Sequence, residues 1–483
     1  AAHEDSAPPL LPEEDAASND DGESPSTLLP PASYWNLIVT HKEYRLFIAS
    51  YIITHCGEWF NYVASMTVLE SVSHSQSRLL RISILICVRL LPNVLVAPLG
   101  GVLADTHDLR ISMIGFDILG AVIALSFIMA QYLERPELIY LSTFLQQSCA
   151  GLYEPCRSAI VPQLVREGPY LQKATTLSGI AWSTMAAVGS SLGGLLVASL
   201  GVSTCFVLDS LTYLLSAWLL WLMHGSFNEA GLANKNDDES SSQHLHSSWW
   251  DRIVGMTWEG IHYMQASPYG ALVWIKFSGA LMFGASDVML AAFASSSSSG
   301  ELQSQKLGYL FASVGVGAMM GPLLSDPCID MNRLITVQRL CVFSFAVICI
   351  GYIGIGASSS FVVLCVFTMI RASGMAVAWI DSTLLIQKLM PSAILGRIFA
   401  ADVALGTGGE CISALYAGLL LDYVPDFTPY QLAFLQAIIS ALLLVLWSVY
   451  HYQGGGAQQE SKSSSSSSSS TVELKSVMDS DSS

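Results

Sequence analysis

RLLPNVLVAPLGGVLADTHDLR, residues 89–110, is an apolar run that ends in a short charged turn. A second apolar run begins directly after it, at Ile111. This pattern predicts two membrane helices joined by a tight polar hairpin. Gly100 and Gly101 have no side chain, so two helix backbones can approach each other closely there. Asp105 stands at the predicted helix end, where its carboxylate can accept hydrogen bonds from the end of a neighbouring helix.

The composition is typical of a protein embedded in a lipid bilayer. Of the 483 residues, 52% are hydrophobic and 12% are charged, whereas soluble proteins carry about 25% charged residues. Much of the acidic charge lies in polar tails and a middle loop, and the absence of a basic stripe argues against nucleic-acid binding. The ten cysteines are scattered without a CxxC or Cys/His cluster, so we expect neither a disulfide framework nor a metal site.

Twelve apolar segments are long enough to cross a bilayer, which takes about 20 residues. They cover residues 46–69, 80–103, 111–133, 138–161, 174–199, 203–224, 268–293, 305–325, 335–357, 361–386, 399–421 and 429–451. The sequence therefore predicts an all-α membrane protein with twelve transmembrane helices in two six-helix halves.

The predicted domains follow from these spans. We expect a disordered acidic tail (1–34), a first six-helix half (35–224), a cytosolic central loop with an amphipathic helix (225–267), a second six-helix half (268–451) and a disordered Ser-rich tail (452–483). Lysine and arginine are more frequent in the loops on the side of the tails, which predicts that both termini are cytosolic. The sequence leaves open whether the membrane is the plasma membrane, the vacuole or the plastid envelope.

Four passages are similar to the major facilitator superfamily, and within it to the enterobactin exporters and macrolide efflux pumps known as transmembrane secretion effectors. They are EYRLFIASYIITHCGEWFNYVA, the stretch 89–110 quoted above, YEPCRSAIVPQLV through GSSLGGLLVASLG, and QKLMPSAILGRIF. The resemblance implies alternating access at a cavity between the two halves, with proton-driven export of a small organic solute, drug-like or siderophore-like. Thr106 and Leu109 replace arginines of the family's loop, and Ser190 replaces a proline, so the gating contacts depart from the family pattern.

No phosphate-binding loop, Ser/His/Asp constellation or metal-ligand spacing occurs, so we expect neither an ATP-driven pump nor an enzyme, and no cofactor. The expected partners are the lipid bilayer, a small-molecule substrate and protons, with the protein acting as a monomer. An uncoupled facilitator and a non-transporting receptor or scaffold of the same fold remain open alternatives.

Charged residues inside membrane helices are costly, so each one is a candidate for function. The cavity candidates are Glu58, Arg89, Glu154, Arg157, Asp287, Arg371, Asp381 and Glu410, and the gating-loop candidates are Gly101, Asp105 and Arg110. Glu58 is either a proton- or substrate-binding carboxylate or a structural partner of Arg89. Glu154 and Arg157 share one helix face; the resemblance places Arg157 near proton coupling, but we favour a local pair that also latches Asp105 or Asp117 at the inner gate. Lys276 is a possible partner for a carboxylate of the second half.

Overall fold

The computed structural model describes residues 34–71, 77–96, 99–100, 103–104, 107–165, 168–225, 227, 271–295, 300–325, 334–389 and 395–450. Within these ranges α-helix is the only regular secondary structure, as the sequence predicts. The two predicted tails and nearly all of the predicted central loop lie outside the described residues.

A short helix, α1 (Tyr34–Thr40), precedes twelve described helices of at least 18 residues. The first six are α2 (Lys42–Ser71), α3 (Arg78–Leu95), α5 (Leu109–Tyr132), α6 (Pro136–Leu164), α7 (Gly168–Leu200) and α8 (Val202–Trp221). The second six are α11 (Ala271–Ser295), α12 (Gly300–Ser325), α13 (Leu334–Gly356), α14 (Phe361–Leu389), α15 (Leu395–Tyr423) and the helix Pro429–Tyr450. Each of the twelve predicted segments coincides with one of these helices over most of its length.

Nine helices in the described part of the chain are apolar enough, by composition, to cross a membrane. The other three long helices, α2, α3 and α6, have 30, 18 and 29 residues. They fall short because they carry charged or polar side chains within their length, among them the charged residues Glu58, Arg89 and Arg157. A count of twelve spans is therefore compatible with the structure, and the three helices that fall short are those that carry most of the first half's candidate site residues.

The second helix ends earlier than expected. The sequence predicts a span over 80–103, but α3 ends at Leu95, where the N–H of Val96 donates to the carbonyl oxygen of Pro92 at 2.8 Å. The chain reaches Pro98 three residues later, and the residue before a proline is disfavoured in a helix. The predicted span is therefore interrupted after Leu95, and the described residues 99–100 and 103–104 beyond Pro98 are helical again.

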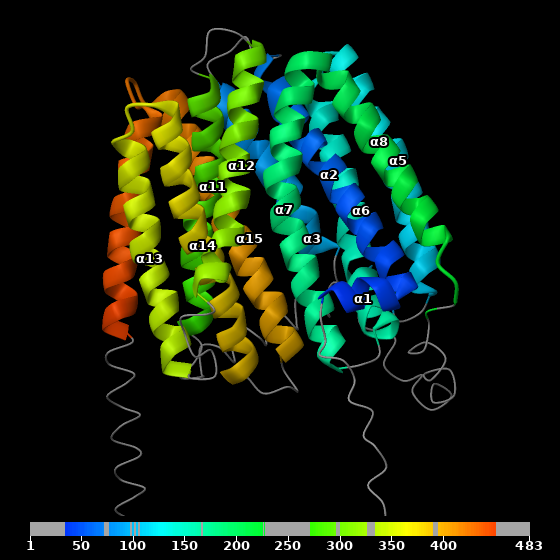
Figure 1. Ribbon diagram of the computed structural model, residues 1–483. Coiled ribbons are helices and arrows are strands. Elements are labelled where there is room, and N and C mark those ends of the chain that lie inside the picture. The colour runs from blue at the N-terminus through cyan, green and yellow to red at the C-terminus, as the bar shows by residue number, and fades with distance from the viewer. Residues whose placement is uncertain are drawn as a thin grey trace, which may run out of the picture.

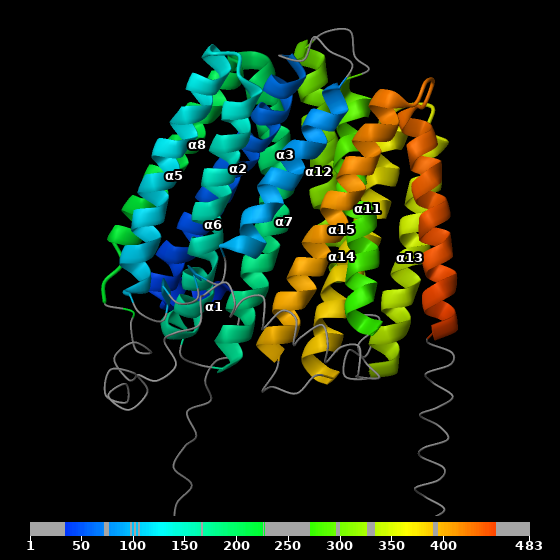
Figure 2. The same ribbon diagram turned by 180° about the vertical axis from the view of Figure 1, so that it is seen from behind.

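The two groups of six helices lie side by side, with α7 against α12 on one face (Figure 1) and α3 against α15 on the other (Figure 2). Between α7 and α12 the backbones touch, since a Cβ atom on Gly194 would lie 2.9 Å from the Cα atom of Gly308. Between α3 and α15 the backbone N–H of Leu80 donates to the Asp422 carboxylate at 2.7 Å. Both contacts lie toward the end of the bundle away from α1.

A buried ion pair joins three helices of the second half. The Lys276 Nζ atom of α11 lies 2.6 Å from Asp402 Oδ2 of α15 and donates to Thr383 Oγ1 of α14 at 3.0 Å. It also lies 4.4 Å from the centre of the Trp379 ring. The sequence suggested Lys276 as a partner for a candidate carboxylate of the second half, but its partner is Asp402, which the sequence analysis did not single out.

We expect Gly194→Ala to lower the free energy of unfolding by about 1–3 kcal/mol, as overpacked contacts do. The new Cβ atom would lie 2.5 Å from the Ser304 carbonyl oxygen. Gly179→Ala is the matched control on the same helix, since its Cβ atom would meet no described atom within 4 Å. Thermal unfolding of the detergent-purified variants measures the difference, and equal melting temperatures would contradict the packing argument.

We expect Lys276→Met to lower the stability by about 3–5 kcal/mol, because it leaves the buried Asp402 carboxylate without its cation. The double variant Lys276→Met/Asp402→Leu should recover most of this loss, since both charges are then removed. The same unfolding measurement tests the pair. A double variant as unstable as the single one would show that the ion pair is not the source of the effect.

Candidate functional site

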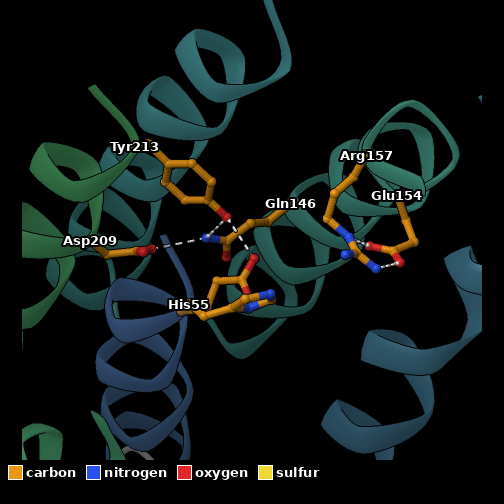
Figure 3. Close-up of polar contacts among 7 residues, drawn as sticks. His55, Gln146, Glu154, Arg157, Asp209 and Tyr213 are labelled. Atoms are coloured by element: carbon orange, nitrogen blue, oxygen red, sulfur yellow. Dashed lines mark hydrogen bonds and ion pairs between the residues drawn. The ribbon is translucent and has the colours of Figure 1, made fainter. Parts of the chain in front are cut away.

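A connected set of polar side chains runs through the interior of the first half. Glu58 of α2 accepts at both carboxylate oxygens: Oε2 lies 2.7 Å from His55 Nδ1, and the Tyr213 hydroxyl of α8 donates to Oε1 at 3.4 Å. Gln146 of α6 donates to the Tyr213 hydroxyl at 3.3 Å and to Asp209 Oδ2 at 2.9 Å (Figure 3). Three helices, α2, α6 and α8, thus supply one network that begins at Glu58.

Asp209 forms the far end of this network. Its side chain is 0% exposed, and Asn61 of α2 donates a second hydrogen bond to its Oδ2 atom at 2.7 Å. The Oδ1 atom has no hydrogen-bond partner among the described residues. The sequence analysis did not name Asp209 or His55. Asp209 lies inside the predicted span 203–224, so the rule that selected Glu58, a charge within a span, also applies to Asp209.

Tyr62 connects the first half to the second. Its hydroxyl donates to Asp287 Oδ2 of α11 at 3.0 Å, and the Arg89 guanidinium of α3 lies 4.0 Å from the centre of its ring. Phe311 of α12 packs against the same ring, with centroids 5.5 Å apart. Tyr62 is one helical turn beyond Glu58 on α2. Asp287, a candidate carboxylate of the second half, is therefore bonded to the helix that carries Glu58, where the halves meet.

Glu58 and Arg89 line one small cavity of about 10 Å³, which is close to the space that one water molecule needs. In the part of the chain that the structure describes, no ion pair joins them. The carboxylate of Glu58 is bonded to His55 and Tyr213, while Arg89 lies over Tyr62. The described contacts thus give no direct support to the hypothesis that Glu58 is the structural partner of Arg89.

Glu154 and Arg157 form the predicted local pair. Arg157 Nε donates to Glu154 Oε2 at 2.7 Å, and its Nη2 atom donates to the other carboxylate oxygen. The guanidinium lies 5.0 Å from the centre of the Tyr51 ring, and the Glu154 side chain is 54% exposed. Asp117, considered as a latch partner, instead accepts a hydrogen bond from the Ser216 hydroxyl at 2.6 Å. Figure 3 shows the Arg157–Glu154 pair apart from the network around Gln146.

The second half places its remaining candidates on α14 and α15. Arg371 is 1% exposed, and its guanidinium lies 5.6 Å from the centre of the Tyr352 ring. Its Nε and Nη2 atoms have no hydrogen-bond partner within the described ranges. Asp381 is buried ten residues further along α14, and Glu410 is partly buried on α15. The deeply buried guanidinium of Arg371 thus lies in the same half as the three candidate carboxylates Asp287, Asp381 and Glu410.

Of the three gating-loop candidates, Gly101 and Asp105 lie outside the described residues. The Arg110 guanidinium donates to the carbonyl oxygen of Met223, just past the end of α8. Asp108, the neighbouring polar residue, caps the N-terminus of α5. These contacts fasten α5 to α8 within the first half, and the latch between the halves stays a prediction. In the described chain, no group of three or more His, Cys, Asp or Glu side chains is placed to hold a metal ion.

Comparison with known proteins connects this geometry to a family. The family model of the transmembrane secretion effectors matches residues 38–481. The uncharacterized MFS-type transporter YfiS of Bacillus subtilis (strain 168) is 23% identical over 398 residues, which cover 80% of this chain and 89% of YfiS.

Solved transporters share the fold at low sequence identity. A bacterial homologue of the iron transporter ferroportin, in its inward-facing state, aligns with a TM-score of 0.62 at 14% identity, covering 85% of this chain and 98% of its own. The nucleoside transporter NupG aligns with a TM-score of 0.58 at 13% identity, covering 84% and 98%. The fold is thus that of these transporters, and since the family model spans nearly all of the described residues, the chain belongs to the transmembrane secretion effectors, a family of major facilitator transporters.

Proposed function

We propose that this membrane transporter is a secondary active exporter that moves a small organic solute, drug-like or siderophore-like, out of the cytosol in exchange for protons. The observation that carries the proposal is that Tyr62 lies between two candidate carboxylates at the contact of the halves: it lines the small cavity that Glu58 also lines, and its hydroxyl donates to Asp287. Carboxyl groups are the side chains best suited to carry a proton through a membrane bundle. The transport direction and the coupling ion in this proposal come from the resemblance to exporters of the family.

Glu58 is the proposed site of proton exchange. Burial disfavours the charged form of a carboxyl group, while hydrogen bonds donated to the carboxylate favour it. Glu58 experiences both effects, because it lies inside the bundle and accepts from His55 and Tyr213. Because these two effects oppose each other, a substrate that binds nearby can determine whether Glu58 keeps or releases its proton.

The Tyr62–Asp287 hydrogen bond couples protonation to movement of the halves. It joins α2 to α11, so it breaks whenever the halves part at this level. A hydrogen bond to an ionised carboxylate is roughly twice as strong as one to a neutral acceptor. Protonation of Asp287 therefore loosens the contact, and the halves rock to expose the cavity on the other side.

The first test is uptake into proteoliposomes with an imposed pH gradient, using amphipathic cations, siderophore-like chelates and organic acids as candidate substrates. We expect the wild type to accumulate at least one class against its gradient. Glu58→Gln keeps the side-chain shape but cannot ionise, so accumulation should fall by a factor on the order of ten or more. Glu137→Gln is the control, because Glu137 lies exposed in the first turn of α6.

Equal accumulation by Glu58→Gln and the wild type would contradict the role of Glu58. Equilibration without accumulation, in both proteins, would favour an uncoupled facilitator. A wild type that moves none of the compounds, and whose cellular role is lost when the tails are deleted, would favour a receptor or scaffold.

A second test uses two thiols that face each other across the α3–α15 interface. The Cys87 thiol of α3 donates to the carbonyl oxygen of Cys411 of α15 at 3.7 Å, so the two cysteines lie next to each other. Neither is in a disulfide in the described structure. Diamide removes two electrons and two protons from such a pair, which joins the sulfurs and reduces the reagent to the hydrazine form.

If α3 and α15 must part during the cycle, the Cys87–Cys411 disulfide stops transport and dithiothreitol restores it. Cys87→Ser should transport normally before and after diamide. Mass spectrometry of the alkylated protein measures how many free thiols are lost. Unchanged transport by fully cross-linked protein would contradict rocking at this interface.

A further inference from the structure

A larger cavity lies inside the first half, and the proposed proton exchange uses only its wall at Glu58. It has a volume of about 60 Å³ and is enclosed by α2, α5, α6 and α8. It differs from the 10 Å³ cavity beside Arg89, since the lining of the two has only Glu58 in common. Glu58 is thus reached from two separate spaces.

Aromatic rings form much of the wall of this cavity. Tyr51 comes from α2, Phe116 from α5, Tyr153 from α6 and Tyr213 from α8, so each of the four helices contributes one ring. Ring faces carry partial negative charge and attract organic cations. One ring already has such a partner, because the Arg157 guanidinium lies 5.0 Å from the centre of the Tyr51 ring.

The polar groups of the lining point to the same class of ligand. Three carboxylates line the cavity, namely Glu58, Asp117 and Glu154. Arg157 neutralises Glu154 through two hydrogen bonds, and no arginine or lysine is bonded to the other two carboxylates in the described structure. Asp117 receives only the neutral Ser216 hydroxyl. A cationic ligand would therefore find Asp117 without a basic side chain bound to it, and Glu58 with His55 as its one basic partner among the described residues.

Two hydroxyl groups of the lining are left without a partner. Thr54 is 8% exposed, and neither its Oγ1 atom nor the Tyr153 hydroxyl has a hydrogen-bond partner among the described residues. A buried hydroxyl without a hydrogen bond is costly, so two of them beside one cavity indicate a guest that supplies the missing bonds. An ammonium group donates to hydroxyl and carboxylate oxygens alike.

We infer that the cavity between α2, α5, α6 and α8 binds the ammonium group of a small organic amine, with Asp117 and Glu58 as its charge partners. The inference rests on the proposed function and names the substrate class, since Glu58 then holds either a proton or the amine. The cavity has room for roughly four water-sized groups, which fits an ammonium nitrogen and three carbon atoms. A larger amine would place only its ammonium group and the adjoining carbon atoms in the cavity.

The test is direct binding of n-propylammonium to the detergent-purified protein by isothermal titration calorimetry, with 1-propanol as the neutral ligand of the same size. We expect n-propylammonium to bind and 1-propanol to give no heat. Asp117→Asn keeps an oxygen that can accept from Ser216 but removes the charge. It should weaken binding by a factor on the order of ten or more, because hydrogen bonds to charged groups are the strong ones. Glu137→Gln should bind like the wild type.

A second variant keeps the inference testable if Asp117→Asn fails to fold. Thr54→Val has the same shape without the unpaired hydroxyl, so we expect it to be at least as thermostable as the wild type and to bind n-propylammonium more weakly. Equal binding of 1-propanol and n-propylammonium, or wild-type binding by both variants, would overturn the inference. Calorimetry needs no pH gradient, so amine binding without proton-driven flux would contradict the proposed function and leave the amine site standing.

Discussion

The hydrocarbon core of a bilayer offers no hydrogen-bond partners, and this constraint decides where the polar groups of the chain lie. Glu58, Gln146 and Asp209 come from three different helices and are linked by hydrogen bonds inside the first half. Gln146 donates to Asp209 directly, and the Tyr213 hydroxyl joins Gln146 to Glu58. Lys276 and Asp402 do the same in the second half. The polar network therefore fixes the rotation of these helices about their own axes, while apolar surface faces the lipid.

Among the described residues, few strong bonds join the two halves. One interface depends on glycine backbones in contact, as at Gly194 and Gly308, and the other on short contacts such as Leu80 to Asp422. Between them, Tyr62 and Asp287 supply one polar link at the level of the candidate site. Small residues give close packing without interlocking side chains, so the halves can move while each keeps its own buried network.

The sequence predicts the helices well because length and hydropathy are local properties. It also predicts the Glu154–Arg157 pair, since spacing along one helix determines that contact. It fails for Lys276, whose partner lies 126 residues away, because such a pair depends on how two helices rotate against each other. For the same reason the charges could be recognised as unusual, while their partners, among them His55 for Glu58, could not be assigned.

The charged side chains within α2, α3 and α6 have a consequence for how the protein enters the membrane. A helix leaves the translocon for the lipid when its own apolar surface outweighs its charges. Along the chain, α2 and α3 precede α5, whose mean hydropathy of 2.2 meets this condition by a wide margin. We therefore expect α2 and α3 to wait at the translocon until α5 arrives, so that these three helices enter the membrane as a group rather than one at a time.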